Sequence, residues 1–127
     1  MEKITDAEAK MRLLTILTRH VGREKAIDMG ELFTRVFDRP WRNKHHDSRI
    51  LRKLIHELRM NGALIGSSRS ANGGGYYQAR STSEIADFLD GQKSEAIRKL
   101  VLVAAMKKIG LPELMGQMAM SLKAQND

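Results

Sequence analysis

The residue pattern changes from helical to strand-like just before the middle of the chain, and this change constrains the fold most. From residue 47 to 60, apolar side chains recur at helical spacing, with Asp47 or His46 as the N-cap and Asn61-Gly62 as a stop. Two short strand-like runs follow, at 63–66 and 76–79, around a loop rich in Gly, Ser and Asn. The sequence therefore predicts a helix over 47–60 followed at once by a β-hairpin with a projecting loop.

Two more helices are predicted before this helix. The first begins at a capping box, Thr5-Asp6-Ala7-Glu8, and ends at Gly22. The second begins at an Asp28 cap and ends before Pro40, because a residue that precedes proline disfavours the helical conformation. Three helices thus precede the hairpin.

The chain after the hairpin is also predicted to be helical. Ser81-Thr82-Ser83-Glu84 forms another capping box, and its helix is expected to bend or break at Asp90-Gly91. The helical pattern resumes near Ser94 and stops at Gly110, and a last helix starts at Leu111-Pro112-Glu113. The predicted fold class is mainly α with a small β-hairpin.

We expect one domain over residues 1–90 and a helical extension over 91–127. The extension has more apolar residues than so short a segment can bury alone, so we expect it to form a homodimer. Its methionines have two interpretations: they fill gaps in a core, or they form an adaptable surface for another protein. They are Met106, Met115, Met118 and Met120.

The positive charge is concentrated in one window. The chain carries a net +7, and residues 39–80 alone hold nine Lys or Arg against two Asp or Glu, whereas both flanks are neutral. On a helical wheel, Arg49, Arg52, Lys53 and His56 lie opposite the apolar face of the 47–60 helix. Such a field attracts a polyanion, above all nucleic acid; an anionic membrane surface and a solvated surface without a partner are the competing interpretations.

Patterns typical of an enzyme, a cofactor site or a metal site do not occur in the sequence. The chain has no Cys, which removes disulfides, thiolate ligands and cysteine nucleophiles. His45, His46 and His56 lack carboxylates at ligand spacing, Gly73-Gly74-Gly75 lacks the Gly-Lys-Ser/Thr of a phosphate loop, and the loop serines lack a nucleophile elbow. We therefore expect a binding protein without catalytic residues, cofactor or metal.

No sequence segment has the length and apolarity of a membrane span. The longest apolar run covers only residues 100–106, and the N-terminal residues lack the apolar stretch of a signal peptide. We expect a soluble, cytoplasmic protein that does not associate with membranes.

Three helices and a hairpin, with a basic outer face on the third helix, resemble the winged helix-turn-helix superfamily of DNA-binding proteins. The likeness covers about residues 5–90. It is carried by Leu-Ile-His-Glu-Leu-Arg-Met-Asn-Gly at 54–62, Leu-Ile-Gly at 64–66 and Gly-Tyr-Tyr at 75–77. The segment 82–89 is similar to the helix that follows the wing in bacterial and prophage regulators.

The resemblance implies that helix 47–60 enters the DNA major groove and that the hairpin over 63–79 is a wing against the backbone or the minor groove. The residues implied to contact DNA are Ser48, Arg49, Arg52, Lys53 and His56 on the helix, and Arg69 on the wing. Arginine suits guanine edges through two parallel hydrogen bonds, whereas Lys53 and the wing serines suit phosphates equally well. Strand alternation places one of Tyr76 and Tyr77 inwards and the other outwards, toward a phosphate.

The connection between the second and third helices departs from the family pattern. The connecting segment, residues 38–46, is longer than the three or four residues of a tight turn. Either the second helix runs further, or residues 39–42 themselves contact the DNA backbone. Arg42 and Lys44 are therefore further candidate contacts.

These features predict a non-enzymatic double-stranded-DNA-binding protein, first of all a transcriptional regulator. The alternatives are a replication or prophage accessory DNA-binding protein, and an adaptor that does not bind DNA and uses its Met-rich helices. RNA binding is disfavoured because aromatic residues, which stack on unpaired bases, make up only 5% of the chain.

Overall fold

The structure is a computed structural model that describes residues 4–69 and 74–126. Those residues form five α-helices and a small three-stranded antiparallel sheet. The predicted mainly α class with a small β element is therefore confirmed. The chain divides into two compact units, one ending at Phe88 and the other beginning at Leu89.

The first two helices begin where the sequence predicts. In α1 (Asp6–Leu17), the Thr5 hydroxyl accepts from the backbone N–H of Glu8 at 3.1 Å. In α2 (Met29–Phe37), the Asp28 carboxylate accepts from two backbone N–H groups of the first turn. The predicted stop of α1 at Gly22 is wrong, because residues 20–22 instead hydrogen-bond to the backbone of Gln78. A short 3-10 turn, η1 (Arg23–Lys25), follows.

The third helix, α3 (Lys44–Met60), begins one turn before the predicted start. Its cap is Asn43, whose side chain accepts from the backbone N–H of His46 at 3.1 Å. Asp47 is buried inside the helix and is not its cap, so the predicted cap is wrong. The helix α2 ends as predicted, since Asp38 takes the left-handed conformation with φ of 55°. The connection is thus shortened by an earlier α3 and not by a longer α2.

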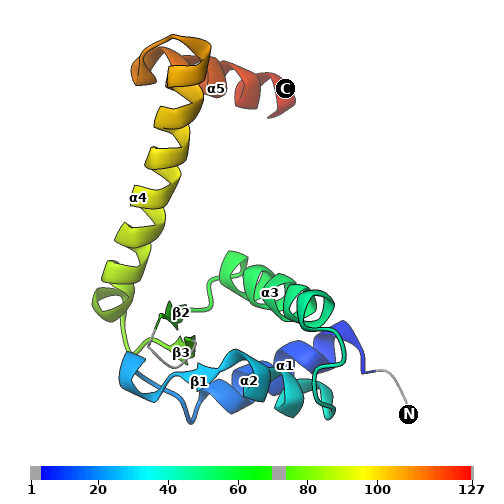
Figure 1. The fold of residues 1–127 in the computed structure, drawn as a ribbon. Helices are drawn as coiled ribbons and strands as arrows, with labels where there is room; N and C mark the ends of the chain where they lie inside the picture. Colours follow the sequence, from blue (N-terminus) through cyan, green and yellow to red (C-terminus); the bar gives the residue numbers. More distant parts are fainter. Residues whose placement is uncertain (1–3, 70–73, 127) are drawn as a thin grey trace. The chain divides into compact units, whose positions relative to one another are not determined.

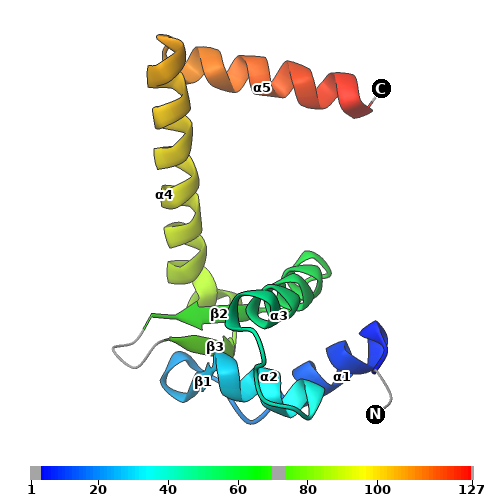
Figure 2. The ribbon, with the colours of Figure 1, turned by 45° about the vertical axis from the view of Figure 1, so that its right-hand side comes forward.

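The sheet contains the predicted hairpin and one strand that was not predicted. Its strands are β1 (Ile27–Asp28), β2 (Ile65–Ser68) and β3 (Gly75–Gln78), in the order β1-β3-β2. Ile65 pairs with Gln78 and Ser68 with Gly75. Figure 2 shows β2 and β3 side by side. The centre of the predicted loop, residues 70–73, lies outside the described residues.

The main core lies between the three helices and the sheet, which Figure 1 shows gathered together. Its largest fully buried side chains include Leu13, Phe33, Leu51 and Ile65, one from each of the three helices and one from the sheet. Trp41 stacks on Phe33, with ring centroids 5.6 Å apart, and lies directly against Gly30. This packing orients α3 so that its other side remains exposed.

Both tyrosines of β3 are buried, so the predicted inward and outward pair is wrong. Tyr76 joins the main core, and Tyr77 packs with Ala79 and Ile85 in a second cluster. The reason is that the first turns of α4 (Thr82–Lys107) cover the side of the strand that faces away from the main core.

The second unit consists of the rest of α4, from Leu89, and of α5 (Leu111–Asn126). The predicted break at Asp90-Gly91 is wrong, since α4 continues through it; an interior Gly weakens a helix by only about 1 kcal/mol. The helix α4 ends at Lys107, three residues before the predicted stop at Gly110. Lys108 takes the left-handed conformation at φ 59°, and the N–H of Ile109 closes the end on the carbonyl of Ala104. None of the helices in the described ranges is long and apolar enough to span a bilayer.

Candidate nucleic-acid interface

The helix α3 has one apolar face and one cationic face. Its apolar side chains are buried against α1, α2 and the sheet: Leu51, Leu54, Ile55 and Leu58. On the opposite side, Arg49, Arg52, Lys53 and His56 are all exposed. The helix therefore presents the side that the wheel predicts, and the core packing holds it there.

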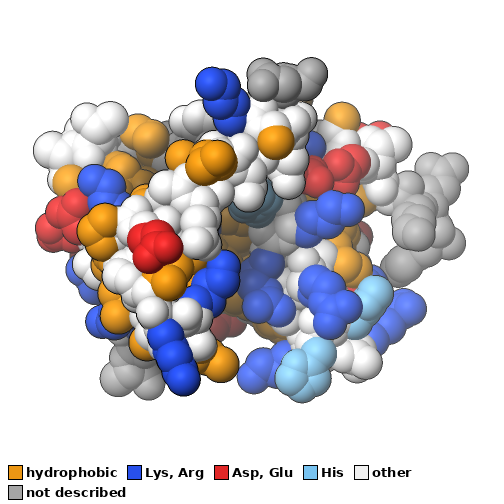
Figure 3. Space-filling model, turned by 90° about the horizontal axis from the view of Figure 1, so that it is seen from above, with side chains coloured by type: hydrophobic (Ala, Val, Ile, Leu, Met, Phe, Trp, Pro, Cys, Tyr) orange, Lys and Arg blue, Asp and Glu red, His pale blue; other side chains and the backbone are white. Residues whose placement is uncertain are grey.

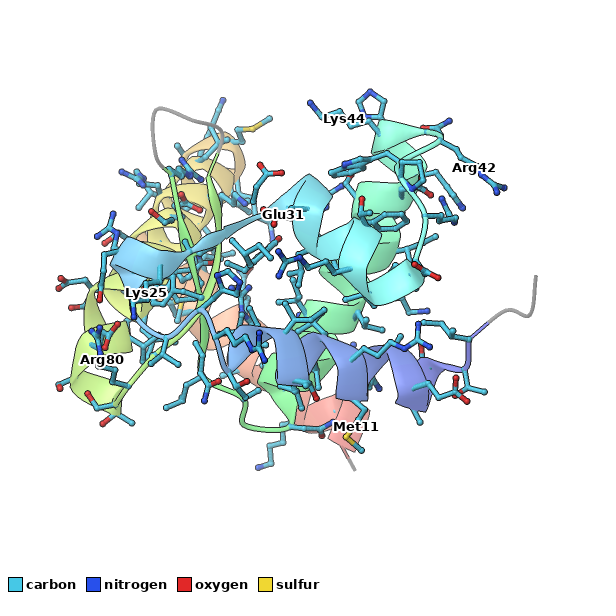
Figure 4. All side chains as sticks on the ribbon, turned by 90° about the horizontal axis from the view of Figure 1, so that it is seen from below. Met11, Lys25, Glu31, Arg42, Lys44 and Arg80 are labelled. Carbon is cyan, nitrogen blue, oxygen red and sulfur yellow. The ribbon has the colours of Figure 1, made fainter. Side chains whose placement is uncertain are left out.

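The extra first turn of α3 adds exposed residues before this cationic face. Lys44, His45 and His46 are exposed on that turn, and Arg42 is exposed two residues earlier. Figure 4 shows Arg42 and Lys44 pointing outwards near the start of α3, at the end of the unit opposite to Lys25 and Arg80. Figure 3 shows Lys, Arg and His side chains gathered over α3. We call Arg42, Lys44, Arg49, Arg52 and Lys53 the α3 cations.

The carboxylates of the same window do not neutralise the α3 cations. Asp47 is bound by Arg39, and Glu57 is bound by Lys10 of α1 at 2.9 Å. The hydrogen bond from Lys10 to Glu57 raises the pKa of Lys10. Within the described part of the chain, the α3 cations form no ion pair. Their charge is therefore available to an external anion.

Asp47 fixes the connection that carries Arg42. Its carboxylate accepts from both terminal nitrogens of Arg39 at 3.2 Å, from the backbone N–H of Arg42 at 2.7 Å and from that of Asn43 at 3.3 Å. These bonds, led by those from Arg39, hold the pKa of Asp47 well below its usual range. The Arg39 guanidinium also lies 4.8 Å from the centroid of the Phe33 ring. Arg39 is thus part of the packing and not of the exposed face.

Two other cations of residues 39–80, Arg59 and Arg80, also form contacts within the folded chain. Arg59 donates to the carbonyl of Ile65 at 2.8 Å and lies 4.8 Å from the Phe88 ring centroid, and its burial lowers its pKa. Arg80 pairs with Glu24 and with Glu84. Counting charges along the sequence therefore overstates the exposed charge. The partial burial of Arg59 could have been predicted, because the helical wheel places this residue at the margin of the cationic face.

Ser48 and Arg52 are coupled to each other. The Arg52 Nε donates to the Ser48 carbonyl at 3.3 Å, and its Nη2 lies 3.5 Å from the Ser48 hydroxyl oxygen. The hydroxyl itself donates to the His45 carbonyl at 3.2 Å. Ser48 is only half exposed, so in this structure it orients Arg52 more than it faces solvent.

The candidate wing residue Arg69 is exposed directly after β2. Ser67 and Ser68, which precede it, are half buried in the strand. The structure thus places Arg69 on the hairpin and the other candidates on α3 or immediately before it.

Two hollows flank these elements in the first unit. One, of about 590 Å³, lies between the start of α1 and α3 and has Arg42, Lys53, Phe37 and Ile50 in its lining. The other, of about 440 Å³, has both signs of charge in its lining, from Arg80, Glu84 and Asp87 among others. The residues that the structure describes contain no cluster of three or more potential metal ligands.

Comparisons with protein-family models, with curated proteins and with solved structures found no match. The function of the chain is therefore inferred from the geometry of the α3 cations and from physical chemistry.

Proposed function

We propose that the protein binds double-stranded DNA as a winged-helix protein, with α3 in the major groove and the β2–β3 hairpin as the wing. The observation that carries this proposal is the set of five α3 cations, four on α3 and Arg42 just before it, exposed and without a carboxylate partner among the described residues, while the apolar face of the helix is buried in the core. The element order, three helices followed by the hairpin, supports the same assignment. The activity is binding, without a catalytic step.

The dimensions of α3 suit the major groove. Its 17 residues span about 25 Å at about 1.5 Å per residue, and the groove is about 12 Å wide, enough for a helix. Arg49 and Arg52 lie one turn apart on the exposed face and can each make two parallel hydrogen bonds to a guanine. Lys53, next to Arg52, and Lys44 and Arg42, near the start of the helix, suit phosphates, which fix the register of the helix on the duplex.

Contacts that fix the hairpin against α3 support its proposed role as a wing. Arg59 ties the end of α3 to β2 through the Ile65 carbonyl, and β3 is paired on both sides, with β1 and with β2. Arg69, just after β2, is the candidate contact to the backbone or minor groove. Transcriptional regulation is the use that we propose for this binding; a replication or prophage accessory protein would use the same surface.

Fluorescence anisotropy with a labelled random duplex tests the proposal. The double variant Arg49→Ala/Arg52→Ala should bind at least about tenfold more weakly, because each lost charge-assisted contact costs about 1–3 kcal/mol. The matched control Arg19→Ala/Lys25→Ala removes two exposed cations that lie outside α3, and its affinity should stay within about twofold of the parent. Equal losses in both variants, or none in either, would contradict a reading face on α3. Unchanged duplex affinity together with capture of another protein would favour the adaptor alternative.

A further inference from the structure

The second unit leaves its apolar side chains uncovered. Of residues 89–125, only Ala104 and Leu114 are buried, and every residue from 115 to 125 is exposed. Figure 2 shows α5 running away from the end of α4. Lys107 Nζ donates to Gln117 Oε1 at 3.1 Å near this junction, so the contact between the two helices lies close to their connection.

A helix in this position needs a surface to pack against. The helix α5 has 16 residues, only slightly more than the about 12–15 residues below which isolated helices are marginal in water even when rich in alanine. Gly116 in its interior weakens the helix by about 1 kcal/mol relative to Ala, and no neighbouring atom requires glycine there, since a Cβ would meet no other atom within 4 Å. Most helix stability in proteins comes from packing an amphipathic face, and here that face lies open.

The open face of α5 is a regular stripe. Leu111, Met115, Met118 and Leu122 follow one another at spacings of four, three and four residues, which is the seam spacing of a coiled coil. Met115, Met118 and Leu122 are 48%, 37% and 58% exposed. Met120, 75% exposed, lies on the other side of the helix and does not belong to the stripe.

The composition of α5 favours a second copy of the chain as the occupant of this stripe. Its charged residues are Glu113 and Lys123 alone, so it has neither the cationic face that binds anionic lipid nor a charge pattern that selects an oppositely charged protein. An apolar stripe complements itself, as a two-fold symmetric interface requires.

The exposed apolar area of the second unit is on the scale of a dimer interface. Taking about 100 Å² for a whole side chain and half of it exposed, the four stripe residues offer on the order of 200 Å² per copy, and the exposed Leu89, Ile97, Val101 and Val103 of α4 offer about as much again. Interfaces are about 60% apolar, so two copies would bury about 700 Å² through the stripe alone, the area of a weak interface, and about 1,300 Å² if the α4 side chains were also covered.

We propose that the protein is a homodimer in which α5 packs against α5 of a second copy through Leu111, Met115, Met118 and Leu122. The dimer carries two α3 helices and therefore suits a two-fold symmetric DNA site. The proposal does not rest on the proposed function, because the dimer forms through the second unit whether or not DNA is bound.

The test is the mass of the full chain in the absence of DNA, by sedimentation equilibrium between about 1 and 100 μM. The parent should have twice the 14.4 kDa chain mass. Met118→Glu/Leu122→Glu, which puts two charges into the seam, should raise the dimer dissociation constant by at least about 100-fold and give the mass of one chain. Circular dichroism of each variant at its working concentration checks that the first unit stays folded.

Met120→Glu is the matched control, because it adds a charge to the same helix on the other side. It should remain a dimer. A parent with the mass of one chain over the whole range, or a dimer that survives the double substitution, would overturn the proposal. A Met120→Glu variant that dissociates as readily as the seam variant would overturn the assignment of the stripe. A parent of single-chain mass that binds another protein or anionic vesicles would give the stripe a different partner.

Discussion

The two units of this chain bury their apolar residues to very different degrees. In the first, three helices and a sheet share a core with fully buried Leu, Ile, Val and Phe side chains, and a second cluster forms on the other side of β3. In the second, Ala104 and Leu114 are buried while most large apolar side chains are exposed. A rigid core in one unit can therefore present a charged helix face, whereas two helices without a core present an apolar one. The first suits a polyanion and the second a packing partner.

The largest effect that separates the units should come from their apolar side chains. Phe33→Ala removes a ring that is fully buried beside Phe37 and Trp41, and should lower the free energy of unfolding by about 3–5 kcal/mol. Leu122→Ala, at an exposed site, should change the unfolding of the first unit by less than about 0.5 kcal/mol. Urea denaturation followed by Trp41 fluorescence measures both. Similar losses of unfolding free energy in the two variants would contradict the difference in burial between the two units.

The hairpin packing can be tested at Gly66. A Cβ at this position would lie 2.3 Å from Tyr77 Cζ, so Gly66→Ala must displace a buried ring and should cost about 1–3 kcal/mol. The exposed Gly62 would be a poor control because its φ of 98° already disfavours Ala. The exposed Ser81→Ala variant suits better, since it should cost at most about 1 kcal/mol through its cap bond to Glu84. A Gly66→Ala protein as stable as the parent would mean that the tyrosine is not packed on this strand.

Low pH should loosen the connection that carries Arg42. Because hydrogen bonds from Arg39 hold the pKa of Asp47 below its usual range, the folded chain binds a proton there less readily than the unfolded chain. This stabilisation is complete above the ordinary Asp pKa of about 3.9 and is lost as the pH falls through the lower pKa of the folded state. Asp47→Asn should lower stability at neutral pH and flatten the acid limb of the stability curve. The exposed Asp38→Asn variant should retain the acid limb, and an identical acid limb in Asp47→Asn would refute the role of Asp47.

The smallest effect should be a gain, at Gly91 of α4. A Cβ there would meet no other atom within 4 Å, and the residue is helical, so Gly91→Ala should stabilise the helix by up to about 1 kcal/mol. Helicity by circular dichroism should rise with the substitution. A fall in helicity would show that α4 is not continuous at this residue.

The sequence predicted most of the helices and the hairpin because their signals are local. Caps at Thr5 and Asp28 and the apolar periodicity of α3 need only neighbouring residues. The strand β1 was not predictable, since two residues hold no pattern and pair only because β3 lies beside them. The continuity of α4 at Gly91 was also not predictable from the sequence, because Gly only weakens a helix and its effect depends on the rest of that helix.

The position of the candidate site was predictable from the sequence, but the exact set of residues that form it was not. The wheel identified the exposed face of α3, yet charge counting could not show that Arg39, Arg59 and Arg80 bind Asp47, a carbonyl and two carboxylates. Those contacts join residues that are distant in sequence or that lie on an irregular connection. Lys44 joined the helix only because Asn43, and not Asp47, provides the cap.

The salt dependence of duplex binding tests whether the α3 cations bind DNA. Three to five phosphate contacts from the α3 cations give a slope of log affinity against log salt of about −2.7 to −4.5, at about −0.9 for each contact. We expect the parent chain to fall in this interval, and Lys44→Ala/Lys53→Ala to lose about 1.8 from the magnitude of its slope. A slope near zero, or the same slope in the parent and in that variant, would contradict DNA binding through α3.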